Sequence, residues 1–364
     1  MRGPASWLTS TRSSVPNSPP AQVLTELYTK HGGFANAFSA TFDPDLCHHI
    51  AKDKDGFVAY ARSPRLRVTV AFFDPVCASD ALPRVIDEFI ATFKPLGRVG
   101  FWKISERTAD LLAARGYACA RYGLDNDLTL PIKLSGPRLR GLRREVSAAR
   151  AAGVRIEKVG ESDEPWADLA AINERWLATR ARRTEIRRAT RRCPLRHEPH
   201  CTKLVARAAD GRLVGWAALD HLYRDGRLVG GGLSTVRWES DSPGIAALLA
   251  HDGIGLLQQQ GAAANIGDGS FVLALGESPL ASEPTDDSVA AHDALPATSR
   301  SRYMEILFRG IYKFGGAVYN MRGITEWKRK WRAEQRWMYV ALERGRRWRQ
   351  PWRETLAVVR LVLF

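Results

Sequence analysis

The sequence predicts an α/β protein built from two similar modules in tandem. Its 364 residues favour two domains, or one large domain, over a single small fold. Runs of β-branched and aromatic residues alternate with amphipathic helical patterns, which is the order typical of α/β folds. The second half repeats the outline of the first half (strands, a long helix, another strand, then a helix), although no sequence motif is repeated.

Residues 22–132 hold the first predicted module. The stretch 56–76 alternates β-branched and aromatic residues around a Ser-Pro turn, which predicts two strands. A helix follows over 79–97, because its apolar residues recur on one face: Val85, Ile86, Phe89 and Phe93. The module is completed by a strand at 98–105, a short helix at 106–117 and a strand at 123–130.

Residues 133–345 hold the second predicted module. Its first helix, over 135–153, places Pro137 in the first turn and spreads arginines over much of its surface. Two Asp-Gly turns predict a three-stranded meander over 202–234. The other elements are a strand at 154–159, a helix at 164–183, a helix at 243–261 that ends at Gly261, and a strand at 269–275.

Three segments fall outside this regular pattern. Residues 1–21, rich in Ser and Pro, predict a disordered tail, and residues 281–300 predict a disordered insertion in the second module. Residues 346–364 contain arginines and tryptophans followed by a mainly apolar end. This composition fits either an interfacial membrane anchor or a last packed helix. No apolar run approaches the roughly 18 residues of a membrane-spanning helix. The five scattered cysteines indicate reduced thiols, so we expect a cytoplasmic protein.

The charge balance points to a polyanionic partner. The chain has 54 basic and 39 acidic residues, a net charge of +15 and an isoelectric point near 9.9. Such a surplus favours nucleic acid or an anionic membrane surface. Three segments concentrate the charge: 140–144, 180–192 and 319–337. We expect them to form one phosphate-binding surface rather than three solvated faces.

Three other patterns are weak candidates for a metal, phosphate-binding or acid–base site. The stretch 193–201, CPLRHEPHC, holds zinc-type donors, but His200 and Cys201 are adjacent and no CxxC pair stands elsewhere, so an ordinary loop is favoured. The glycines at 230–232 lack the following helix that a phosphate-binding loop needs. Asp220 and His221 are neighbours in a strand and point to opposite faces, which argues against an acid–base pair.

The most basic aromatic stretch is YNMRGITEWKRKWRAEQRW, residues 319–337. If one helix runs through it, Trp327, Trp331 and Met338 share one stripe, and Lys328 lies beside Arg332. An amphipathic helix with packed tryptophans and solvated cations explains this pattern as well as a functional site does. Composition alone therefore assigns no role to the stretch.

Residues 307–331, LFRGIYKFGGAVYNMRGITEWKRKW, resemble the segment that closes the C-terminal domain of bacterial phosphatidylglycerol lysyltransferases. The matching positions are Tyr312, Phe314, Gly315, Tyr319, Asn320, Gly323, Ile324, Trp327, Lys328, Lys330 and Trp331. Weaker similarities lie around GESPL (276–280), DSPG (241–244), FFDPV (72–76) and the arginine-rich helix at 135–153. The resemblance covers about residues 35–345 in the expected order.

The resemblance implies two GNAT-like modules in tandem and an aminoacyltransferase activity. Members of the family move an amino acid from an aminoacyl-tRNA to the hydroxyl of a membrane lipid. The acceptor is phosphatidylglycerol in bacterial members and a sterol, ergosterol, in some fungal relatives. The lack of a preceding membrane-spanning region and the 281–300 insertion point to the sterol branch. The resemblance implies aminoacyl-tRNA as co-substrate, no other cofactor, and peripheral contact with a membrane.

The resemblance also implies the site residues. Lys328 and Lys330 are expected to stabilise the oxyanion or hold terminal phosphates, and Arg332 to share that contact with tRNA. Asp241 and Glu277, each beside a family-like motif, are candidates for the proton acceptor. Further tRNA contacts are assigned to Arg143, Arg144, Arg180 and Arg183; Tyr319 and Trp327 either line the lipid cavity or belong to the core.

Two other classes of function remain open. An acyl-CoA-dependent GNAT N-acyltransferase should carry a Q/R-x-x-G-x-G/A pyrophosphate loop before a helix, and no match to this pattern precedes a predicted helix. A non-catalytic RNA- or membrane-binding protein would keep the basic surface, and Lys328→Ala would then change binding without abolishing a product. A transferase that acts on amines is a variant that the sequence does not distinguish.

Overall fold

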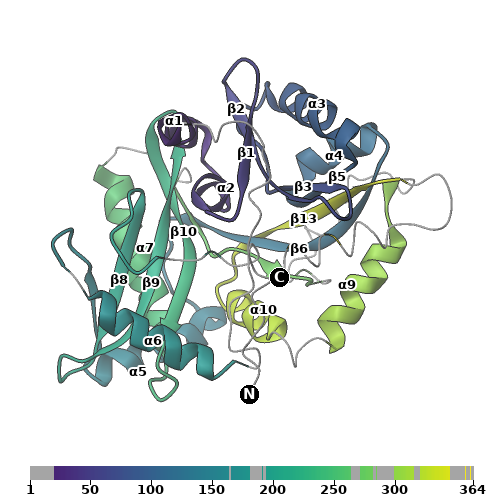
Figure 1. The fold of residues 1–364 in the computed structure, drawn as a ribbon. Coiled ribbons are helices and arrows are strands. Elements are labelled where there is room, and N and C mark those ends of the chain that lie inside the picture. The colour runs from purple at the N-terminus through teal and green to yellow at the C-terminus, as the bar shows by residue number, and fades with distance from the viewer. Residues whose placement is uncertain are drawn as a thin grey trace, which may run out of the picture.

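The computed structural model describes residues 20–163, 165–180, 191, 194–263, 271–281, 284, 299–314, 320–344, 357 and 361. In this part of the chain, one mixed 13-stranded sheet runs through the molecule with helices against both faces (Figure 1). The strand order is β1-β2-β3-β5-β13-β6-β11-β10-β9-β8-β7, with β4 paired to β2 and β12 to β6. The predicted α/β class is confirmed. No helix of the described residues is both long and apolar enough to cross a bilayer.

The first half contains the predicted elements, two additional helices and two additional short strands. The helix predicted over 79–97 is α3 (Leu82–Phe93), and all four residues of its predicted apolar face are buried. The additional helices, α1 (Ala21–His31) and α2 (Ala37–Phe42), precede the first strand. The remaining elements are β1 (Cys47–Ile50), β2 (Gly56–Ser63), β3 (Val68–Phe72), β4 (Val76–Cys77), β5 (Arg98–Ser105), α4 (Glu106–Ala114) and β6 (Tyr117–Leu130).

The second half confirms the predicted meander and helices. Both Asp-Gly turns of the meander are formed, and Gly211 and Gly226 adopt the positive φ angles, 86° and 75°, that favour glycine. The helix predicted to end at Gly261 runs on to Ala263. The elements are α5 (Arg140–Ala151), β7 (Arg155–Lys158), α6 (Trp166–Ala178), β8 (Cys201–Arg207), β9 (Leu213–Arg224), β10 (Arg227–Trp238), α7 (Ile245–Ala263), β11 (Phe271–Ala274), β12 (Ser278–Pro279), α9 (Arg302–Phe314), α10 (Met321–Arg329) and β13 (Glu334–Glu343).

Helices cover opposite faces of the sheet because strand side chains alternate between the faces. At one end, α3 and α4 cover one face, and α9 packs on the other (Figure 1). At the other end, α5 and α7 share one cluster, whereas α1, α2 and α6 share a second. On β9, Ala217 belongs to the first of these clusters and Trp216 to the second. The helices α5 and α6 therefore lie on different faces of the sheet.

The strand β13 lies between β5 and β6, with which it pairs in antiparallel fashion. A continuous helix through residues 319–337 is therefore wrong, since α10 ends at Arg329 and β13 begins at Glu334. Arg332, in the turn between them, has a φ of 54°, which no helix accommodates. Trp331 is fully buried in the core, whereas Met338 belongs to the strand.

Several predicted features fall on residues outside the described part of the chain. Nearly all of the expected disordered tail (1–21) and insertion (281–300) lie there. In the segment 346–364, only Ala357 and Leu361 are described, and both pack against the cluster that contains Met304. The sheet runs without a break across the expected module boundary at residues 132 and 133, and the position of that boundary stays a prediction.

Candidate active site

Four charged side chains meet where the two halves of the sheet join. They are Lys103 on β5, Asp125 on β6, Glu277 in the turn between β11 and β12, and Lys328 on α10. Three of them are largely buried. The side chains of Lys103 and Glu277 are 3% and 10% exposed, and Lys328 as a whole residue is 8% exposed. We call these four residues the central cluster. Buried charges are costly unless they are paired, so such a group marks a candidate for function.

The helix α10 points Lys328 into the molecule. Its first turn is capped by Asn320, whose Oδ1 accepts a hydrogen bond from the Gly323 amide at 2.9 Å. Met321, Thr325 and Lys328 are the buried residues of this helix, and their spacing places them on one face. The ammonium of Lys328 donates a hydrogen bond to the backbone carbonyl of Glu277.

The carboxylate of Glu277 is held on both of its oxygens. Lys103 Nζ lies 2.9 Å from Oε2, and the side-chain amide of Asn36 donates to Oε1 at 3.2 Å. Since Asn36 immediately precedes α2, this contact connects that helix to the central cluster. Glu277 therefore receives three donors, two on its carboxylate and one on its backbone carbonyl.

A buried amide network fixes the turn that carries Glu277. Asn126 Nδ2 donates to the carbonyl of Gly276 at 2.9 Å and lies 3.1 Å from the hydroxyl of Ser278. Its Oδ1 accepts a hydrogen bond from Gln335 Nε2 at 3.0 Å. The network joins β6, β13 and the turn, and it limits the movement of Glu277.

The backbone around Lys103 is strained. Lys103 and Phe73 have φ angles of 60° and 66°, in a region that residues other than glycine rarely adopt. The amide of Phe73 donates to the carbonyl of Trp102 at 2.8 Å, and the Phe73 ring lies 5.5 Å from Lys103 Nζ. Strain of this kind costs about 1–3 kcal/mol per residue and concentrates at functional sites.

The electrostatics of the cluster favour proton transfer. The pKa of Lys328 is lowered to about 8, mainly by burial and in part by the charge of Lys103, while Asp125 and Glu277 oppose the fall. Burial also raises the pKa of Asp125, and the charge of Glu277 adds to that rise. A lysine with a pKa near 8 is about one-tenth neutral at pH 7, so its amine is able to accept a proton.

Of the four predicted catalytic residues, the structure brings Lys328 and Glu277 together. Lys330 points the other way, and its Nζ forms an exposed ion pair with Glu145 of α5 at 2.7 Å. Asp241 is exposed in the turn before α7, where its carboxylate accepts a hydrogen bond from Ser242. Neither residue contributes to the central cluster.

The predicted tRNA-binding arginines are divided between two faces. Arg144 is exposed on α5, and the Lys330–Glu145 pair brings α10 and the exposed Arg332 beside that helix. Arg143 donates to the carbonyl of Gly136 at 2.6 Å and so supports the preceding loop. Arg180 follows α6, on the other face of the sheet, and stacks on Trp176 at 3.9 Å. Arg183 lies outside the described residues.

Of the two predicted lipid-binding aromatics, the structure describes only Trp327. Trp327 is partly buried and packs against the core between α5, α7 and the sheet, with its ring 5.8 Å from that of Trp331. Tyr319 lies outside the described residues. The structure therefore gives Trp327 a place in the core.

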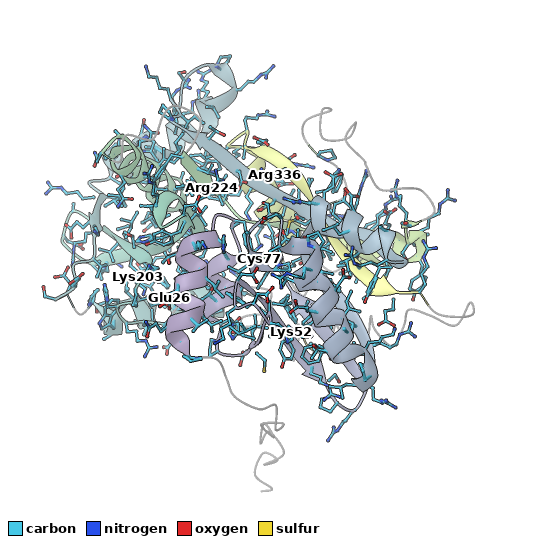
Figure 2. The ribbon with its side chains drawn as sticks, turned by 90° about the horizontal axis from the view of Figure 1, so that it is seen from above. Glu26, Lys52, Cys77, Lys203, Arg224 and Arg336 are labelled. Atoms are coloured by element: carbon cyan, nitrogen blue, oxygen red, sulfur yellow. The ribbon has the colours of Figure 1, made fainter. Side chains whose placement is uncertain are left out.

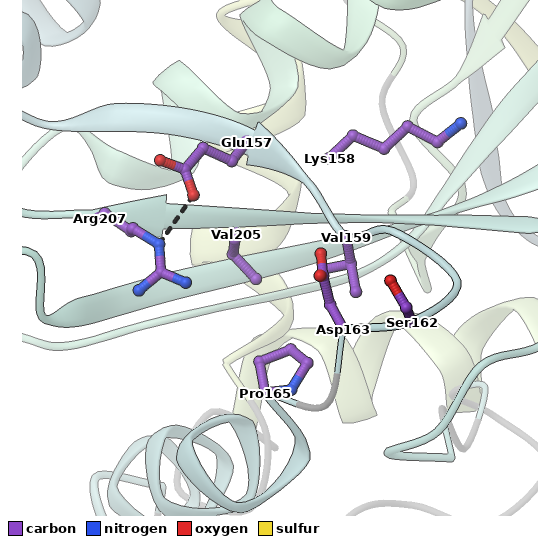
Figure 3. Close-up of a pocket in the computed structure, with 8 residues that line it drawn as sticks. All are labelled: Glu157, Lys158, Val159, Ser162, Asp163, Pro165, Val205 and Arg207. Atoms are coloured by element: carbon purple, nitrogen blue, oxygen red, sulfur yellow. Dashed lines mark hydrogen bonds and ion pairs between the residues drawn. The ribbon is translucent and has the colours of Figure 1, made fainter.

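The described residues line at least two cavities. One, of about 400 Å³, opens between α2, α6 and strands β9 and β10, and its wall includes Phe38, Phe42, Asn173, Trp216 and Thr235. Within the described residues, the buried Trp216 Nε1 and Thr235 Oγ1 have no hydrogen-bond partner. The other, of about 530 Å³, is a polar pocket at the outer strand β7 (Figure 3). No predicted site residue lines it.

The described residues around 193–201 do not form a metal site. His197, His200 and Cys201 are described, whereas Cys193 is not. Among the residues with assigned positions, no group of three or more His, Cys, Asp or Glu side chains is arranged to hold a metal ion. The Nδ1 of His200 instead lies 3.0 Å from the hydroxyl of Tyr223.

Sequence reasoning missed Lys103, Asp125 and Asn126. A signal was present, since Lys103 interrupts the apolar strand RVGFWKIS, and Asp125 and Asn126 interrupt GLDNDLTL. Charged or amide side chains inside a buried strand need partners, which is a reason to look for a site. Nothing local in the sequence shows that the partner is Glu277.

The family described as phosphatidylglycerol lysyltransferase, C-terminal, matches residues 25–342. Two relatives are bifunctional proteins named for lysylphosphatidylglycerol biosynthesis, LysX, from Mycobacterium sp. (strain KMS) and Mycobacterium avium (strain 104). They are 31% identical over 153 residues and 30% identical over 152 residues. Each match covers 38% of this chain, but only 14% and 13% of the relative.

Two solved structures share the fold. The structure of L-PGS from Bacillus licheniformis has a TM-score of 0.72 and 20% identity, covering 96% of this chain and 98% of that one. A C-terminal DUF2156 domain from Agrobacterium fabrum has a TM-score of 0.65 and 21% identity, covering 89% of this chain and 92% of that one. These likenesses extend over nearly the whole described fold.

Proposed function

Because the chain belongs to the phosphatidylglycerol lysyltransferase C-terminal family, we propose that it transfers an aminoacyl group to the hydroxyl of a membrane lipid. The donor in this proposal is an aminoacyl-tRNA. The acceptor is phosphatidylglycerol, because the mycobacterial relatives are named for lysylphosphatidylglycerol biosynthesis. A sterol is the alternative acceptor. The central cluster is the observation that supports this chemistry, since it presents a lysine of lowered pKa beside a fixed carboxylate.

In this mechanism, the lipid hydroxyl attacks the carbonyl carbon of the aminoacyl ester. The neutral amine of Lys328 accepts the hydroxyl proton as the new C–O bond forms. The bond to the tRNA ribose oxygen then breaks, and Lys328 returns the proton to that oxygen. A pKa near the working pH suits both steps. No proton is gained or lost overall, so one ester replaces another.

Glu277 and Lys103 act as positioning residues in this scheme. The carboxylate of Glu277 contacts Lys103 and Asn36 and so anchors both side chains at the site. Its backbone carbonyl holds Lys328 Nζ and directs that nitrogen. Lys103 also keeps a positive charge close to the site, which favours a developing oxyanion.

The donor and its aminoacyl group are assigned to separate surfaces. We place the phosphates of the tRNA acceptor stem along α5 and the end of α10, where Arg140, Arg144 and Arg332 are exposed. The aminoacyl side chain is placed in the cavity of about 400 Å³, because α2 lines that cavity and Asn36 links α2 to Glu277. Cavities of this size suit small ligands.

Lipid analysis of cells that express the chain, with and without Lys328→Ala, tests the proposal. We expect a new lipid that is heavier by one amino-acid residue, and a rate reduced roughly 100-fold or more in the variant, as for loss of a general base. In a lysate, ribonuclease should abolish the product. Lys52→Ala, an exposed lysine at the turn before β2, is the matched control and should leave the product unchanged (Figure 2).

The same experiment separates the other functions. An N-acyltransferase predicts an acyl-CoA requirement and no ribonuclease sensitivity. A non-catalytic RNA- or membrane-binding protein predicts no new lipid from a folded preparation, and that result would end the proposal. The mass of the product identifies the amino acid and distinguishes a phosphatidylglycerol ester from a sterol ester.

A further inference from the structure

The helix α9 exposes an unusual amount of apolar surface. Among the described residues, six large apolar side chains are exposed, and four of them belong to this helix. They are Tyr303 (54% exposed), Ile306 (68%), Ile311 (36%) and Phe314 (77%). Single exposed apolar residues are ordinary, but a group on one short helix indicates an interaction surface.

The opposite face of α9 already anchors the helix to the sheet. Met304 and Phe308 are buried, and the Phe308 ring lies 6.2 Å from Trp102 and 6.0 Å from Tyr122. Residues three or four positions apart share a helix face, so Met304 and Phe308 form the inner face and Ile306 points away from it. Ile306 is therefore not needed to hold α9 in place.

Cations flank the exposed apolar side chains. Arg302, Arg309 and Lys313 are all exposed on the same helix. Its only acidic residue is Glu305, which is engaged by Arg300, with Nη2 and Oε1 3.0 Å apart. An apolar band beside a basic stripe is the pattern of a helix that lies in the plane of a membrane surface. It complements anionic lipid headgroups in charge and acyl chains in polarity.

We propose that α9 docks lengthwise on a lipid bilayer that contains anionic lipid. Ile306 and Phe314 enter the boundary between headgroups and acyl chains, and Arg302 and Arg309 contact phosphates. The inner face of α9 rests on β5 and β6, the strands that carry Lys103 and Asp125, so docking brings the central cluster toward its lipid (Figure 1). The inference rests on the proposed function for its purpose, but its test is independent of catalysis.

The test is flotation of the full chain with vesicles, without any aminoacyl donor. Vesicles of phosphatidylcholine that include phosphatidylglycerol should bind the chain, and vesicles of phosphatidylcholine alone should bind it weakly. Ile306→Ser with Phe314→Ser should weaken binding roughly 100-fold, because two large apolar side chains no longer enter the bilayer. Arg302→Gln with Arg309→Gln should reduce the preference for phosphatidylglycerol and its sensitivity to salt. All four positions are exposed, so the fold should be retained.

Leu96→Ser is the matched control, since Leu96 is a large exposed apolar residue outside α9, and it should not change binding. Equal binding of wild type and the Ile306→Ser, Phe314→Ser variant would overturn the proposal, as would no binding to either vesicle. Self-association that these substitutions abolish, without vesicle binding, would show a contact between copies instead. Activity on a short-chain, water-soluble lipid tests the proposed function separately, because that reaction needs no bilayer.

Discussion

Lys103 and Glu277 form a buried ion pair across the junction of the two halves, with Nζ and Oε2 2.9 Å apart. Lys103 comes from β5 and Glu277 from the turn between β11 and β12, so the pair ties distant parts of the chain together. Lys328 donates to the backbone of the same glutamate. The pair therefore serves both the stability of the fold and the geometry of the candidate site.

Glu277→Gln should lower the free energy of unfolding by about 3–5 kcal/mol, because Lys103 and Lys328 would remain as buried charges without that carboxylate. Denaturant unfolding measures the change. Glu157→Gln is the control, since it removes a carboxylate from an exposed pair with Arg207, with Nε and Oε2 2.7 Å apart (Figure 3). That loss should be below about 1 kcal/mol. Equal losses in the two variants would contradict the importance given to the buried pair.

Stability should depend on pH through Lys328. Burial lowers its pKa from 10.5 to about 8, so the unfolded chain binds the proton more tightly than the folded chain between these values. The resulting penalty is complete below about pH 8 and disappears as the pH rises to 10.5. Between these limits, the free energy of unfolding should rise by about 3 kcal/mol more in the wild type than in Lys328→Met.

The comparison between wild type and variant cancels the titration of other groups. Lys52→Met, which removes an exposed ammonium, should leave the wild-type pH dependence in place. Parallel stability curves for wild type and Lys328→Met from pH 8 to 10.5 would show that the pKa of Lys328 is not lowered by folding.

Binding of acceptor-stem RNA should depend on the exposed arginines of α5. Arg140→Gln with Arg144→Gln should weaken binding. It should also reduce the slope of log affinity against log salt by about 1–2, since binding releases about one counterion fewer for each phosphate contact that is lost. Fluorescence anisotropy over a salt series measures both quantities. Lys52→Gln with Lys54→Gln removes two exposed charges from the first half and should have little effect. If both double variants behave alike, RNA recognition does not reside on α5.

Local patterns in the sequence predicted most helices and strands, because apolar spacing and turn residues reflect local conformational preferences. The apolar spacing of Val85, Ile86 and Phe89 defined α3, and the Asp-Gly pairs defined the turns of the meander. The same approach failed at residues 319–337, where Trp327 and Trp331 fit a helical stripe that the backbone leaves at Arg332. A helical pattern of apolar residues predicts the backbone poorly where a segment pairs as a strand with residues elsewhere in the chain.

The candidate site was only partly accessible to sequence reasoning. Lys328 and Glu277 were found through their motifs, whereas Lys103 and Asp125 were not, because their role depends on strands brought together by tertiary structure. The separation of the predicted RNA-binding arginines also results from tertiary structure. Arg144 and Arg180 lie in segments of similar composition, but the alternation of strand side chains puts their helices on opposite faces.

The position of β13 also constrains how the chain can fold during translation. Its two neighbours, β5 and β6, follow one another closely in the chain, and they are joined only through a strand translated more than 200 residues later. Until residues 334–343 leave the ribosome, both strands have an exposed edge, which is prone to wrong pairing. A polypeptide cut short before that point would lack the middle of its sheet and, with it, the support of Asn126 by Gln335. A shortened translation product would therefore be unable to perform the proposed transfer.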